Sequence, residues 1–66
     1  MTGKVIRFNK TKGFGFIKVE DDRDVFFHYS VIEMEGFKDI QVGTDVDVDI
    51  EETDRGLRAT RVKKIS

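Results

Sequence analysis

Hydrophobic and polar residues alternate in several short segments of the chain, a pattern typical of β-strands with one buried face. In the clearest segment, 45–50, aspartate alternates with valine or isoleucine. The pattern predicts strands at 4–8, 14–19, 24–29, 45–50 and 57–64, with polar turns between most of them and a long irregular connection at 30–43. We therefore expect one all-β domain over residues 1–66, folded as a compact five-stranded barrel, because closure removes the exposed edges of an open sheet.

Two of these strands carry phenylalanines that share a face with charged or polar residues, which predicts that the rings are exposed. The faces in question carry Phe14, Phe16, Lys18, Asp24, Phe26 and His28. If the strands are antiparallel neighbours, Phe14, Phe16, Phe26 and His28 form one contiguous aromatic patch. The alternative is that these rings belong to the core, where phenylalanine is most often found.

The supply of other apolar residues argues against a core made of these rings. An interior can be built from Val5, Ile17, Val19, Val25, Phe27, Ile32, Val46, Val48, Ile50 and Val62. Adding four more rings would overfill a barrel of 66 residues. We therefore predict an outward-facing aromatic row.

Composition excludes several classes of function. The chain has no cysteine and one histidine, so thiol catalysis, disulfides and an imidazole zinc site are not expected. No nucleophile or carboxylate pair is recognisable, and we predict neither an enzyme nor a cofactor. No apolar run is long enough for a signal peptide or a membrane span, so we expect a cytoplasmic protein with no membrane partner.

Charge is segregated along the chain although the net charge is only −1. Residues 1–18 carry +5, residues 19–54 carry −11 and residues 55–66 carry +5. The acidic strand 45–50 predicts a solvated face that repels nucleic acid, with a Mg²⁺ or Ca²⁺ site as the less favoured alternative. An aromatic row beside lysines suits single-stranded nucleic acid, because bases stack on rings while cations contact phosphates. A barrel that binds protein or oligosaccharide through the same face remains the alternative.

Short motifs are spread over essentially the whole chain: Gly3-Lys4-Val5, Phe8-Asn9, Lys12-Gly13-Phe14-Gly15-Phe16-Ile17, Asp24-Val25-Phe26, His28, Ser30, Glu35-Gly36-Phe37-Lys38, Arg55-Gly56 and Ala59. Together they resemble the pattern of the bacterial cold-shock protein family. The segments 12–17 and 25–29 correspond to the two ribonucleoprotein-like motifs of that family. The resemblance implies a five-stranded antiparallel Greek-key barrel of the oligonucleotide/oligosaccharide-binding type, binding single-stranded RNA or DNA, often pyrimidine-rich. It also implies an RNA chaperone or transcription antiterminator of cold-shock type, and we expect a monomer.

The resemblance also implies which residues bind. The stacking positions would be Phe14, Phe16, Phe26, His28, Tyr29 and Phe37, and the polar contacts would come from Lys12, Asp24 and Arg55. One departure concerns the site directly, because Arg7 stands where the family usually has a stacking tryptophan. A guanidinium group can stack on a base and also reach a phosphate, so we expect binding to persist with altered strength.

Overall fold

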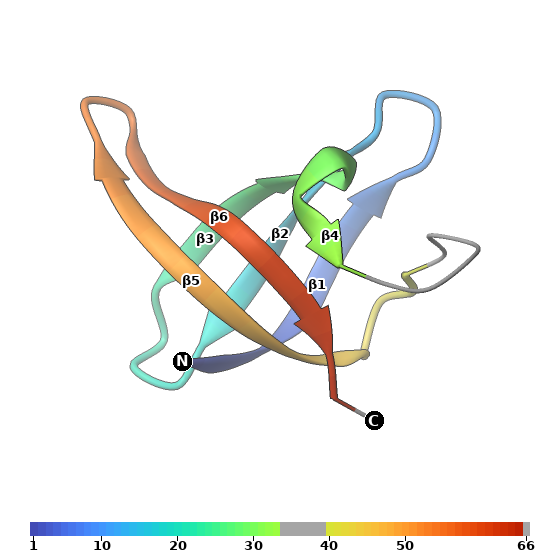
Figure 1. Ribbon diagram of the computed structural model, residues 1–66, viewed down its shortest axis with the longest axis horizontal. Helices are drawn as coiled ribbons and strands as arrows, with labels where there is room; N and C mark the ends of the chain where they lie inside the picture. Colours follow the sequence, from blue (N-terminus) through green and yellow to red (C-terminus); the bar gives the residue numbers. More distant parts are fainter. Residues whose placement is uncertain (34–39, 66) are drawn as a thin grey trace.

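The computed structural model describes residues 1–33 and 40–65. These residues form β1 (Thr2–Asn9), β2 (Phe14–Val19), β3 (Asp24–His28), the 3₁₀ turn η1 (Tyr29–Val31), β4 (Ile32–Glu33), β5 (Asp45–Thr53) and β6 (Gly56–Lys64) (Figure 1). All five predicted strands are present. The connection predicted to be irregular contains η1 and β4, and β4 pairs in parallel with β6. Two residues are too few for an alternating pattern, so this distant pairing left no local signal.

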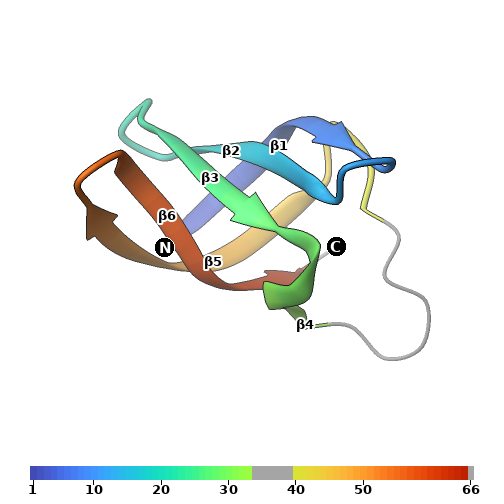
Figure 2. The same cartoon turned by 90° about the horizontal axis from the view of Figure 1, so that it is seen from above.

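The strands close into a barrel. Antiparallel neighbours follow the order β3-β2-β1-β5-β6, and a further parallel pairing of β3 with β6 closes the circuit. Three consecutive strands are followed by one, β5, that returns beside the first, which is the Greek-key arrangement. Figure 2 shows β1, β2 and β3 across the top of the barrel, with β5 and β6 below them. The predicted all-β barrel is therefore confirmed.

A β-bulge in β1 changes which residues face the core. Val5 pairs with Ile17 and Arg7 pairs with Phe16, so Ile6 is the extra residue on β1. Strict alternation from the buried Val5 would turn Arg7 inward, and the bulge instead sends Arg7 to the outer face. The next residue, Phe8, is then directed inward.

The core is mainly aliphatic, as predicted. It consists of Val5, Ile17, Val19, Val25, Phe27, Ile32, Ile40, Val46, Val48, Ala59 and Val62. Among the residues that the structure describes, Phe27 is the one aromatic side chain of this core, and the half-buried Phe8 stacks on it with ring centroids 5.8 Å apart and planes inclined by 8°. Sequence reasoning missed Ile40, which lies in the long connection. It also placed Ile50 in the core, whereas Ile50 is only partly buried and follows a register shift in β5.

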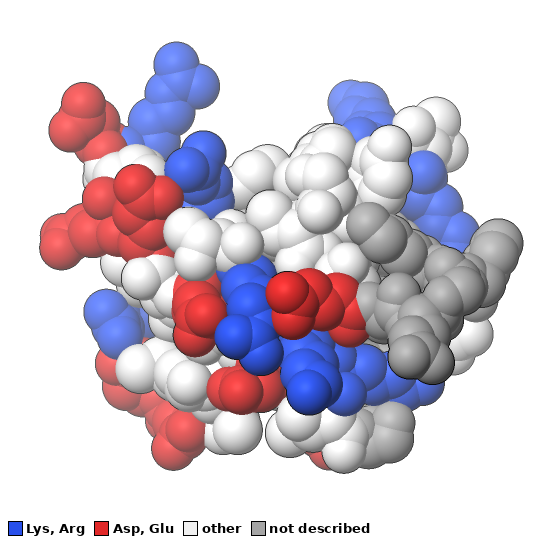
Figure 3. All heavy atoms as spheres, viewed as in Figure 1, with Lys and Arg blue, Asp and Glu red and all other residues white. Residues whose placement is uncertain are grey.

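Acidic side chains of β5, the strand predicted to form a face that repels nucleic acid, form ion pairs with cations of the neighbouring strands. Arg58 and Arg61 of β6 lie opposite Glu51 and Asp49 in the register, and ion pairs of 2.9 Å and 3.7 Å join them. Lys4 of β1 reaches the carboxylate of Asp45 at 3.7 Å. Figure 3 accordingly shows acidic and basic side chains intermixed over β5 and β6. Local alternation could not indicate these ion pairs, because it carries no information about the partner strand. That this solvated face repels nucleic acid stays a prediction.

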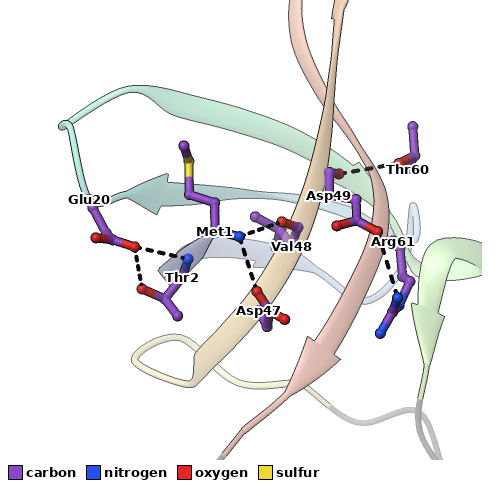
Figure 4. A network of polar contacts seen from close by, with 8 residues as sticks. All are labelled: Met1, Thr2, Glu20, Asp47, Val48, Asp49, Thr60 and Arg61. Carbon is purple, nitrogen blue, oxygen red and sulfur yellow. Dashed lines mark hydrogen bonds and ion pairs between the residues drawn. The ribbon is translucent and has the colours of Figure 1, made fainter.

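Polar contacts also join the beginning of β1 to two other segments (Figure 4). The Met1 ammonium donates to a carboxylate oxygen of Asp47 at 3.1 Å and to the Val48 carbonyl at 3.2 Å. The backbone N–H and the hydroxyl of Thr2 donate to the Glu20 carboxylate at 3.2 Å and 2.7 Å. These hydrogen bonds hold the pKa of Glu20 below its ordinary value.

Residues 1–33 and 40–65 contain no helix long and apolar enough to cross a membrane. They also contain no group of three or more histidine, cysteine, aspartate or glutamate side chains that could hold a metal ion.

Candidate functional site

Aromatic side chains from β2 and β3 form a row on the outer surface of the barrel. Phe14 lies opposite His28 in the antiparallel register, and Phe16 lies opposite Phe26. Because directly paired residues share a face, all four side chains lie on the same side of the sheet. The Phe26 ring centroid is 5.6 Å from that of Phe14 and 5.8 Å from that of Phe16. The predicted outward row is therefore present, with Phe26 in contact with two other rings.

Tyr29 extends this row beyond the end of β3. Its ring centroid is 4.7 Å from that of His28, and its side chain is 48% exposed. The backbone N–H of Tyr29 donates to the carbonyl of Gly13 at 2.8 Å, which ties η1 to the turn before β2. Gly13 has a φ of +76°, and a Cβ there would lie 2.6 Å from the Tyr29 ring. A glycine is thus required both by the turn and by the ring lying over it.

The His28 ring is held in a defined orientation by the start of η1. Its Nδ1 accepts the backbone N–H of Ser30 at 3.2 Å and lies 2.8 Å from the Ser30 hydroxyl. With Nδ1 acting as an acceptor, the proton of the neutral ring is on Nε2, and the ring surface stays exposed. This arrangement suits a stacking ring. Contacts within the protein therefore fix the orientation of the His28 ring.

Gly15 allows the backbone of β1 to lie close to β2, beside the row. It lies opposite Phe8, and a Cβ on Gly15 would stand 2.2 Å from the Arg7 carbonyl oxygen and 2.9 Å from the Phe27 ring. Real Cβ atoms do not tolerate such distances. The alternation of glycine and phenylalanine in 13–16 therefore has a packing cause: the glycines admit neighbouring groups and the phenylalanines face outward.

The cations that border the row differ in whether an acid neutralises them. Lys18 is 4.0 Å from the carboxylate of Asp24, and Arg58 is bound to Glu51. Arg7, Lys12 and Arg55 form no ion pair within residues 1–33 and 40–65. Free cations beside exposed rings are the arrangement that binds phosphates while the rings hold bases.

Lys12 is placed by the turn between β1 and β2. Its backbone N–H donates to the side-chain oxygen of Asn9 at 3.1 Å, the pattern of a turn stabilised by asparagine. Asn9 itself lies opposite Phe14, so the turn carrying Lys12 adjoins that end of the row. The sequence indicated Lys12 as one of several cations near the rings, and the family resemblance implied its polar contact; the structure shows that the hydrogen bond from its backbone N–H to Asn9 positions it.

The tip of the β5–β6 hairpin flanks the other side of the row. A hollow of about 600 Å³ is lined by Phe16 and Phe26 together with Arg55, Leu57 and Arg58. Arg58 is the residue of β6 that pairs with Phe26 across the closure of the barrel. Sequence reasoning placed Arg55 in the site but not Leu57 or Arg58. The pairing of β3 with β6 joins residues far apart in sequence, so no local pattern could have identified them.

Phe37 was predicted to complete the row, and it lies outside the described residues. The remaining predicted residues occupy one surface. Phe14, Phe16, Phe26, His28 and Tyr29 form the row, and Arg7, Lys12, Asp24 and Arg55 lie around it.

Comparisons with known proteins show the family to which the chain belongs. The family model described as the 'Cold-shock' DNA-binding domain matches residues 1–65. The chain is 48% identical over 65 residues to the cold shock-like protein CspB of Bacillus cereus, covering 98% of this chain and 100% of that protein. It is 52% identical over 64 residues to the cold shock-like protein CspLB of Listeria monocytogenes, covering 97% of each.

A solved structure shows the same fold. It is titled drosophila Unr CSD456 and superposes with a TM-score of 0.75 at 20% sequence identity. The match covers 98% of this chain but only 26% of that longer one.

Proposed function

The chain belongs to the family of cold-shock DNA-binding domains, which bind nucleic acids, and we propose that it holds unpaired bases of single-stranded RNA or DNA on the aromatic row. The observation that carries the proposal is the contiguous outward packing of Phe14, Phe16 and Phe26. Such a surface would cost free energy if it served no ligand, because apolar rings are left in water. Every base has a π-face that can cover them.

Each side chain has a distinct part in this proposal. The stacking rings are Phe14, Phe16, Phe26, His28, Tyr29 and Phe37, and the polar contacts come from Arg7, Lys12, Asp24 and Arg55. Lys12 and Arg55, which have no acidic partner among residues 1–33 and 40–65, contact phosphates, and these contacts fix the path of the strand across the rings. The carboxylate of Asp24 is an acceptor with the same sign of charge as a phosphate, so it contacts donors on a base edge instead.

The consequence for a folded RNA is a competition for its bases. Each stacked base contributes about 1–3 kcal/mol, so a few captured bases outweigh the pairing free energy of a weak hairpin. The protein would then act as an RNA chaperone or transcription antiterminator, without catalysis. We further propose that residues 1–66 act as one domain, as a cytoplasmic monomer with a preference for pyrimidine-rich strands.

Titration with oligo-dT and oligo-U tests the proposal. We expect saturable binding whose log K falls with log salt concentration at a slope of about −0.7 for each neutralised phosphate. The Phe16→Ala variant should bind about 5- to 150-fold more weakly, the equivalent of about 1–3 kcal/mol. Absence of binding by the parent protein, or parent-like affinity in the variant, would refute the proposal and favour a protein- or oligosaccharide-binding barrel.

A further inference from the structure

Arg7 and Asp24 stand beside the same ring of the row, and we propose that they make one position of the binding surface selective for guanine. This inference rests on the proposed function, because it needs a base stacked on Phe16. It concerns the identity of one base within a strand that is otherwise held without much selection.

The geometry brings three kinds of group to one place. Arg7, Phe16 and Asp24 line a single shallow hollow together with Ile6. The bulge at Ile6 directs Arg7 to the outer face directly opposite Phe16, and Asp24 begins the neighbouring strand on the other side of β2. A ring surface thus lies between a donor group from β1 and an acceptor group from β3.

The charges around this hollow leave Arg7 available. Besides Arg7, the cations of β1 and β2 are Lys4 and Lys18. Both have carboxylate partners, Asp45 for Lys4 and Asp24 for Lys18. Within the described ranges Arg7 has no such partner. The contact between Lys18 and Asp24 is long, at 4.0 Å, and their side chains are 47% and 59% exposed. Such an exposed pair is weak, so Asp24 can still accept from a base.

Guanine is the base whose edges match this pair. It presents two adjacent acceptors, O6 and N7, and the commonest specific contact of arginine is bidentate to them. Its N1–H and N2–H₂ groups are donors that a carboxylate accepts. Adenine and cytosine each place an amino donor where the guanidinium would have to donate, and thymine and uracil offer it one acceptor instead of two. In a single strand these edges are open to side chains.

A contact of Arg7 with phosphate alone is the competing assignment, and affinities for different bases separate the two. The probes are single-stranded dT₇ and a series of the same strand with one guanine moved through successive positions. We expect guanine at one position to bind at least about fivefold more tightly than thymine there, which is the lower end of discrimination by a bidentate arginine. Replacing that guanine with 7-deazaguanine, which lacks N7, or with hypoxanthine, which lacks the amino group, should each remove most of the gain.

Variants assign the selectivity to residues. Arg7→Lys keeps the positive charge but loses the planar fork, so the ratio of its affinities for the preferred guanine strand and for dT₇ should fall below twofold. Asp24→Asn should lose the difference between guanine and hypoxanthine. Lys4→Gln is the matched control, since it removes one cation from the same strand and should keep the full preference for guanine.

Three results decide the matter. Equal affinity for all strands of the series with intact binding of dT₇ would overturn guanine selectivity and leave the proposed function standing. A uniform loss of affinity in Arg7→Gln across all strands, with a salt slope smaller by about 0.7, would assign Arg7 to a phosphate and also overturn it. No binding of any strand by the parent would overturn both the inference and the proposed function.

Discussion

Phe26 and Phe27 are neighbours in β3 that face opposite sides of the barrel, and they allow one chemical change to be tested in two environments. Phe27 is 0% exposed and packs in the core, whereas Phe26 is partly exposed and lies in the aromatic row. Leucine is an apolar replacement in both places but offers no ring for stacking. We predict that Phe26→Leu weakens binding, whereas Phe27→Leu weakens the fold.

The magnitudes follow from the contacts of each ring. Phe26→Leu removes the platform for one base, which should raise Kd about 5- to 150-fold, equivalent to about 1–3 kcal/mol. Its contacts with Phe14 and Phe16 are ring pairs worth about 0.5–1.5 kcal/mol each at most, and leucine retains part of that packing. We therefore expect the free energy of unfolding to fall by less than the sum for the two ring pairs, about 3 kcal/mol.

For Phe27→Leu the costs are reversed. The variant loses the stacked pair with Phe8, about 0.5–1.5 kcal/mol, and leaves a small cavity in the core. A total of about 1–3 kcal/mol is expected, against an overall stability of about 3–10 kcal/mol for a domain of this size. Most molecules therefore remain folded, and Kd measured on the folded fraction should stay within about twofold of the parent, since no base would stack on a buried ring.

Urea denaturation measures the free energy of unfolding, and fluorescence or calorimetric titration with dT₇ measures Kd. The comparison of the two variants is its own control, because both change the same residue type in the same strand. The reasoning would be refuted if Phe27→Leu lost more affinity than Phe26→Leu, or if Phe26→Leu bound like the parent.

Three further outcomes are expected. Gly15→Ala should destabilise the protein by about 2 kcal/mol or more, because its Cβ would overlap the Arg7 carbonyl and force β1 away from β2; a change under 0.5 kcal/mol in urea denaturation would contradict this. Arg61→Gln should cost about 0.2–1 kcal/mol at low salt and less at high salt, since it removes a cation between two exposed carboxylates, and a cost that grew with salt would be inconsistent with ion pairing. In an NMR titration, Thr2→Ala should raise the pKa of Glu20 toward its ordinary value of 4.5, and an unchanged pKa in the variant would count against the hydrogen bond. In the parent, the stability from this contact is present above about pH 4.5 and is lost as the pH falls through the lower folded-state pKa of Glu20.

Much of the site was predictable because the relevant information is local. Successive side chains of a strand point to opposite faces, so a lysine beside Phe14 and Phe16 was enough to indicate the outer face of β2. The same reasoning applied to β3, and the register of the two strands confirmed that their rings adjoin. Lys12 and Arg55 lie in turns without periodicity. The sequence indicated Lys12 only as one of several cations near the rings, and the specific polar contacts of both residues were implied by the family resemblance.

The surroundings of the row depended on contacts between distant segments. The hairpin tip with Leu57 and Arg58 reaches Phe26 through the closure of the barrel, and two acids of β5, Asp49 and Glu51, form ion pairs with arginines of β6. Neither fact leaves a trace within one strand, because strand alternation states which face a residue occupies and not which strand lies next to it.

Arg7 shows most clearly what the sequence determines and what only the tertiary structure decides. The chain by itself determined that an arginine stands in β1 near two exposed rings, and strict alternation from Val5 would have turned it toward the core. Only the tertiary structure placed it outside, by inserting Ile6 as an unpaired residue so that Val5 and Phe8 both reach the interior. The physical reason is that the Phe8 ring packs on Phe27 when it is turned inward, and the bulge in β1 allows this orientation. That displacement is what brings the guanidinium group beside Phe16.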